Sequence, residues 1–65
     1  MNIISCVASD LTAGDKILRT KDDILVIRTV SKVEVLSERT NTMEISDTLE
    51  GHYILKRDEI ILTVK

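Results

Sequence analysis

The chain has 65 residues, a net charge of −2 and one cysteine, Cys6, so it suffices for a single domain and excludes an internal disulfide. The acidic balance argues against avid, nonspecific binding to nucleic acid, and the apolar content of 43% argues against disorder. Ile, Val and Thr supply 22 of the 65 residues, and these β-branched side chains favour strands. The sequence therefore predicts one all-β domain over residues 1–65.

The first half of the chain is expected to hold two strands and the start of a long third segment. Residues 2–7 read as a strand that the stretch "ASDLTAG" ends, with Leu11 plugging inward. Gly14 is expected to adopt a positive φ, and Asp15 to hydrogen-bond back across this turn before a strand over 15–20. After a tight turn at "KDD" (21–23), residues 24–38 are interpreted as one long strand that bends near Ser31.

The second half alternates strands with short turns. "RTN" (39–41) reads as a turn before a strand over 42–46, and "DTLEG" as a turn that ends at Gly51. In the strand over 52–56, Tyr53 and Leu55 share one face, and "RDE" (57–59) is expected to form a single 3₁₀ turn before a last strand over 60–64. The side chains expected to point inward are Met43, Ile45, Ile60, Leu62 and Val64.

Five or six short antiparallel strands in so short a chain predict a small barrel, because closure removes unpaired edges. The residues "DLTAGDKI" (10–17) and "KRDEIILTV" (56–64) resemble the L-x-x-G-D-x-I opening and the 3₁₀ turn with last strand of small SH3-like β-barrels. In length and plan the chain is similar to the small orphan SH3-like proteins of phages and mobile elements. The resemblance implies a phage-encoded accessory protein in the host cytoplasm.

Few residues carry the pattern of catalytic or metal chemistry. One His and one Cys are too few for a zinc site, and no cofactor motif is present, since "TAGDK" lacks the glycines and ending of a phosphate loop. A Cys6–His52 dyad would need exposure and an orienting group such as Asp47 or Glu50. The adjacent acidic residues at 22–23 and 58–59 are typical of solvated turns. We therefore expect no enzyme, no cofactor and no metal site.

Two binding surfaces are weighed against each other. Basic residues on consecutive predicted strands form a face that would track a phosphate backbone: Lys16, Arg19, Arg28 and Lys32, with Lys21 in the turn. Interleaved Asp15, Asp22 and Asp23 and the scarcity of aromatic residues argue against that use. Surplus apolar residues opposite the predicted core suggest a protein interface instead: Leu25, Ile27, Leu36, Ile54 and Ile61.

The preferred hypothesis is a non-catalytic protein-binding module that docks on another protein or on itself as a homo-oligomer. The alternative is a nucleic-acid-associated regulator that uses the basic face. No membrane segment is expected, because "MNIISCVA" is too short to span a bilayer, and the cytoplasm is the expected compartment. A slip of one residue in the unbroken "ILVI" block would exchange the inner and outer faces of that strand.

Overall fold

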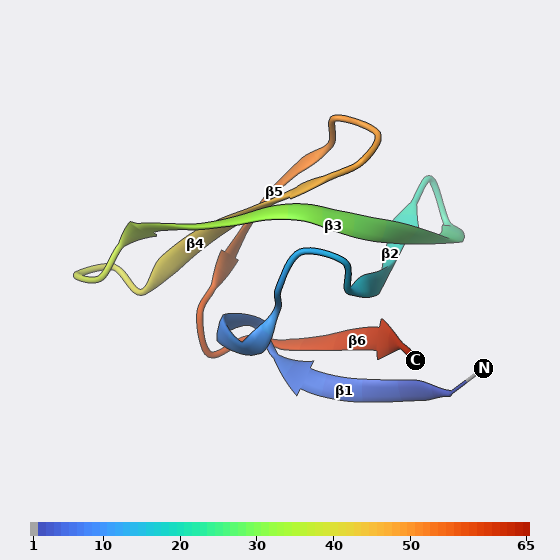
Figure 1. The fold of residues 1–65 in the computed structure, drawn as a ribbon, viewed down its shortest axis with the longest axis horizontal. Coiled ribbons are helices and arrows are strands. Elements are labelled where there is room, and N and C mark those ends of the chain that lie inside the picture. Colours follow the sequence, from blue (N-terminus) through green and yellow to red (C-terminus); the bar gives the residue numbers. More distant parts are fainter. Residues whose placement is uncertain (1) are drawn as a thin grey trace.

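The computed structural model describes residues 2–65, which form six strands and one short helical turn (Figure 1). Every strand pairing is antiparallel, and the strands form one sheet in the order β1-β6-β2-β3-β4-β5. The prediction of an all-β chain with five or six antiparallel strands is therefore confirmed, with six strands observed. The strands are β1 (Ile3–Val7), β2 (Lys16–Lys21), β3 (Ile24–Ser37), β4 (Thr42–Asp47), β5 (His52–Lys56) and β6 (Ile60–Val64).

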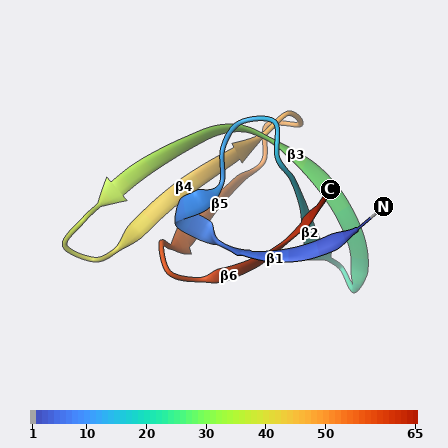
Figure 2. The same ribbon diagram turned by 60° about the horizontal axis from the view of Figure 1, so that its bottom comes forward.

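The long strand β3 joins the two halves of the sheet. Its first part pairs with β2, and its second part pairs with β4. The register shifts between Val30 and Lys32, which leaves Ser31 as the extra residue of a bulge. This bulge explains the bend predicted near Ser31, and it lets the sheet curl around one interior (Figure 2).

The interior is aliphatic, as the composition predicted. Leu11 plugs it from the loop after β1, and Met43 and Ile45 enter it from β4, so these three predictions are confirmed. Thr63 is also buried there, and its hydroxyl donates to the Ile4 carbonyl at 2.9 Å. The buried apolar residues are Ala8, Leu11, Ile17, Val30, Met43, Ile45, Leu55 and Ile61.

The sheet is open, whereas a closed barrel was expected. Within residues 2–65, β1 and β5 are its two edges and do not pair. After Val7 the chain turns into the 3₁₀ helix η1 (Ala8–Asp10), whose N–H groups bond the loop before β6 instead of β5. Ala8 N donates to Glu59 O at 2.8 Å, and Ser9 N donates to Arg57 O at 2.9 Å.

Two expectations about the end of the chain are wrong. The 3₁₀ turn lies at η1 and not before β6, where Glu59 N donates to Lys56 O in an ordinary turn. In β6 the inward residues are Ile61 and Thr63, while Ile60 and Leu62 are exposed. Three successive apolar residues, "IIL", carry no alternation, so periodicity alone does not select the inner face.

The turn predictions at both glycines hold, for different physical reasons. Gly14 has a φ of 98°, and the Asp15 carboxylate accepts from Thr12 N at 2.9 Å across the turn. At Gly51 it is space that requires glycine, because a Cβ there would collide with the Asp47 carboxylate. No helix in residues 2–65 has the length and apolar character to cross a membrane.

Candidate functional site

The outer face of the sheet is apolar over β1, β6, β2 and the first part of β3. Register places Ser5 opposite Leu62 and Leu18 opposite Ile27, so both pairs share this face. Its exposed aliphatic side chains, named here the apolar outer face, are Ile3, Leu25, Ile27, Ile60 and Leu62, each 41–64% exposed. Soluble chains rarely present such a continuous apolar sheet face to water.

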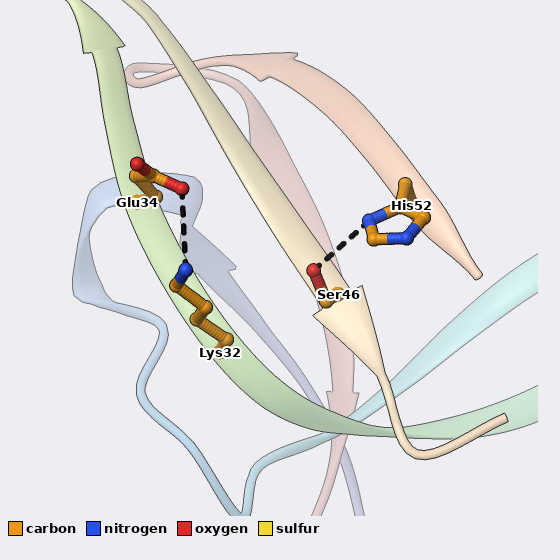
Figure 3. A network of polar contacts seen from close by, with 4 residues as sticks. All are labelled: Lys32, Glu34, Ser46 and His52. Carbon is orange, nitrogen blue, oxygen red and sulfur yellow. Dashed lines mark hydrogen bonds and ion pairs between the residues drawn. The ribbon is translucent and has the colours of Figure 1, made fainter. Parts of the chain in front are cut away.

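The outer face over the other half of the sheet is polar. Lys32 and Glu34 form an exposed ion pair at 3.5 Å on β3, and Ser46 Oγ lies 3.1 Å from His52 Nδ1 across β4 and β5 (Figure 3). Exposed charge pairs contribute little stability, and this face is ordinary solvated sheet surface.

The five residues predicted as a protein interface do not form one patch. Leu25 and Ile27 belong to the apolar outer face, as expected. Leu36 and Ile54 are exposed on the polar half, on the far side of the bulge at Ser31. Ile61 is 4% exposed and packs in the core, so its predicted exposure is wrong.

A concave pocket of about 430 Å³ opens on the inner side, between the β2–β3 hairpin and the β4–β5 hairpin. Thr48 N donates to Thr29 O at 3.0 Å and ties the second hairpin to β3. The volume falls within the range of small-molecule sites. The lining residues are Arg19, Thr20, Lys21, Val26, Arg28, Asp47, Leu49, Gly51, His52 and Tyr53.

Asp47 is the polar hub of this pocket. One carboxylate oxygen accepts from Leu49 N and Gly51 N, both at 2.8 Å, and the other accepts from the Tyr53 hydroxyl at 2.6 Å. The Tyr53 hydrogen bond, the two backbone donors and the nearby Arg28 hold the pKa of Asp47 below its ordinary value. The same hydrogen bond, with burial, raises the pKa of Tyr53. Asp47 is therefore ionised at neutral pH, and both of its carboxylate oxygens already accept hydrogen bonds.

Cations occupy the opposite wall. The Arg19 guanidinium lies 4.8 Å from the centre of the Tyr53 ring, within the range of a cation–π contact. Arg28 donates to its neighbour's carbonyl, Ile27 O, at 3.1 Å. Among residues 2–65 the one ion pair is Lys32–Glu34, so Arg19, Lys21 and Arg28 have no carboxylate within 4.0 Å.

The basic face predicted from the sequence is divided by the sheet. Arg19 and Arg28 reach the pocket on the inner side, whereas Lys16 lies on the outer side, next to Val64. Lys32 is also outward and is paired with Glu34. Four side chains split between two faces cannot track one phosphate backbone, so the structure does not bring this set together.

Cys6 and His52 are also kept apart. Cys6 pairs with the buried Ile61 and faces inward, while His52 pairs with Ser46 and faces outward. Burial and the carboxylates of Asp15 and Asp10 raise the pKa of the Cys6 thiol, which lowers its thiolate fraction. In the described part of the chain, no three His, Cys, Asp or Glu side chains are grouped to hold a metal ion.

The sequence reasoning treated Asp47 only as an orienting group and left Tyr53 without a partner. The available signal was the spacing in "DTLEGHY", since an Asp that begins a turn commonly accepts from N–H groups two to four residues later. Comparison with protein-family models, with curated proteins and with solved structures found no match to the chain.

Proposed function

We propose that the protein is a non-catalytic, SH3-like binding module that associates with a second copy of itself through the apolar outer face. The observation that carries the proposal is the exposure of the five large aliphatic side chains of the apolar outer face. Burial of such side chains contributes about 25 cal/mol for each Å² removed from water. When a second copy covers this face, the aliphatic side chains are buried between two sheets, as in a β-sandwich.

The dimensions of the face suit sheet-on-sheet packing. The strands pair along their length within β1–β6 and within β2–β3, and the two pairs of strands meet at Lys16–Val64 and Ile17–Thr63. At a rise of about 3.4 Å per residue, strands of five or six residues are roughly 17–20 Å long. Two sheets of this size pack face to face at about 10 Å in sandwich proteins. The face is thus large enough to be the apolar core of a dimer contact, with its polar rim completing the interface.

The rim of the face carries charges of both signs. Lys16 lies where β2 meets β6, next to Val64, and Lys65 follows β6. The turn between β2 and β3, with Asp22 and Asp23, and the loop before β6, with Asp58 and Glu59, lie on opposite sides of the molecule (Figure 1). A second copy of the chain offers the same apolar face with a rim of both charges, so it is the occupant that we propose.

Light scattering on the pure protein over a concentration series tests the proposal. We expect the mass of a dimer, which falls toward that of one chain on dilution. Leu62→Asp should give a monomer, because it places a charge in the centre of the contact. Ile54→Asp is the matched control, since Ile54 is 66% exposed on the polar half and its replacement should leave the dimer intact.

Circular dichroism must show that both variants keep the wild-type strand signal. A wild-type chain that is monomeric at every concentration contradicts the proposal. A dimer that survives Leu62→Asp and is lost with Ile54→Asp places the contact on the other half of the sheet and also contradicts it.

A further inference from the structure

The inner pocket lies on the opposite side of the sheet from the apolar outer face, and self-association gives it no role. It collects three cations in a chain of net charge −2. Its one anion, Asp47, accepts three hydrogen bonds from its own hairpin and from Tyr53. The wall formed by β2 and β3 therefore presents an excess of positive charge to the cavity.

We propose that this pocket binds a small organic phosphate, with Arg19, Lys21 and Arg28 holding the phosphate group. Stacking on the Tyr53 ring orients Arg19 and leaves the in-plane N–H groups of its guanidinium free to donate. Two guanidinium groups on adjacent strands, supported by an ammonium, match the charge and the several acceptor oxygens of a phosphate. A single carboxylate would satisfy fewer of these donors.

The rest of the cavity indicates what the phosphate is attached to. A volume of about 430 Å³ greatly exceeds a phosphate ion, and Val26 and Leu49 supply an apolar wall beside the Tyr53 ring. Such a lining suits a compact organic group with an apolar or planar part. A nucleoside monophosphate has this combination of charge and shape.

Acidic residues on both flanks limit the ligand to a small molecule. Asp22 and Asp23 follow Lys21 at the hairpin tip, and Glu50 precedes Gly51 on the facing loop. A nucleic-acid strand that entered the pocket would carry its neighbouring phosphates past these carboxylates. A single phosphate held between the arginines avoids that repulsion.

Titration of the ¹⁵N-labelled protein, followed by two-dimensional NMR at low salt, tests the proposal. The probes are adenosine monophosphate, adenosine, inorganic phosphate and a single-stranded DNA 8-mer. We expect the monophosphate to shift the amides of β2, of the start of β3 and of residues 47–53. Adenosine should bind at least about tenfold more weakly, because it lacks the charged acceptor.

Arg28→Gln and Lys21→Gln should each weaken the monophosphate about tenfold or more, whereas Lys16→Gln, with the same charge change on the outer face, should leave it unchanged. Within residues 2–65 the Lys21 side chain makes no hydrogen bond or ion pair, so its variant keeps the test valid if Arg28→Gln disturbs the fold. Equal affinity for adenosine and its monophosphate, or no shifts with the monophosphate, overturns the proposal. Tighter binding of the 8-mer than of the monophosphate overturns the restriction to small ligands.

Discussion

The two halves of the sheet differ in what their outer faces present to water. Over β4, β5 and the end of β3, charged and polar residues predominate on the outer side, with Leu36 and Ile54 exposed among them, and hydrogen bonds to Asp47 hold the β4–β5 hairpin on the inner side. Over β1, β6, β2 and the start of β3, aliphatic side chains occupy both sides. An antiparallel sheet with one apolar face removes its apolar side chains from water when that face packs against the core. The half of the sheet with two apolar faces does so only when a second layer also covers its outer face.

The same comparison separates the ways in which the halves are stabilised. The β4–β5 half depends on a few hydrogen bonds to one carboxylate, so single polar substitutions should damage it. The other half depends on distributed aliphatic packing, so its polar substitutions should matter little. Three substitutions on or near the hub measure this contrast.

The largest effect is expected from Asp47→Ala. It removes the acceptor of Leu49 N, Gly51 N and the Tyr53 hydroxyl, which leaves three part-buried donors without their partner. The free energy of unfolding should fall by about 3 kcal/mol. Glu44→Ala is the control, because Glu44 lies on the outer side of the same strand, directly opposite Glu34. Its effect should stay within about 0.5 kcal/mol.

Urea unfolding of both variants measures the difference. Equal destabilisation by Asp47→Ala and Glu44→Ala would show that the hub has no special part in holding the β4–β5 hairpin. The unfolding must be compared at one protein concentration, since association adds to apparent stability.

A smaller loss is expected from Gly51→Ala. The new Cβ would collide with the Asp47 carboxylate and would lie 3.1 Å from the Tyr53 hydroxyl, so the hub must shift. Crowding of this kind costs about 2 kcal/mol. Gly14→Ala should cost about 1 kcal/mol through its φ of 98° alone, since nothing lies near the added methyl group. Thermal unfolding that shows Gly51→Ala as the milder change would contradict this reading of the hairpin.

Of the three substitutions at the hub, the smallest effect is expected from Tyr53→Phe, about 1.5 kcal/mol at pH 7, and it should depend on pH. The lowered pKa of Asp47 means that its contribution is complete above its ordinary value of 3.8 and is lost as the pH falls through the lower folded-state value. The raised pKa of Tyr53 makes its contribution complete below 10.0 and lost as the pH rises further. The difference between wild type and variant should therefore narrow below pH 3.8 and above pH 10. A difference in unfolding free energy that stays constant from below pH 3.8 to above pH 10 would contradict the hydrogen bond between Tyr53 and Asp47.

The sequence predicted structural features well where a few neighbouring residues determine the local conformation. Gly14 requires a positive φ, and the alternation of Met43 and Ile45 fixes the inner face of β4. The bend at Ser31 was visible because the alternation changes phase there. Each of these features depends on a few neighbouring residues, so no distant contact was needed to read it.

Features that depend on contacts between distant segments could not be predicted from the sequence. The inner face of β6 depends on which of Ile60, Ile61 and Leu62 meets β2, and the "IIL" run is compatible with either choice. Alternation along β2 already places Lys16 and Arg19 on opposite faces, because they lie three residues apart. The position of Arg28 on the same face as Arg19 follows from the pairing of Ile17 with Arg28, which no local pattern encodes. The open edge between β1 and β5 follows from η1, whose bonds run to a loop about fifty residues later.

Intermolecular nuclear Overhauser effects in a mixture of ¹³C-labelled and unlabelled protein test the covered face most directly. The account predicts contacts between the methyl groups of Leu62 and Ile27 in one copy and those of Ile60 and Leu25 in the other. Contacts from Ile54 and Leu36 alone, or no contacts at millimolar concentration, would contradict it.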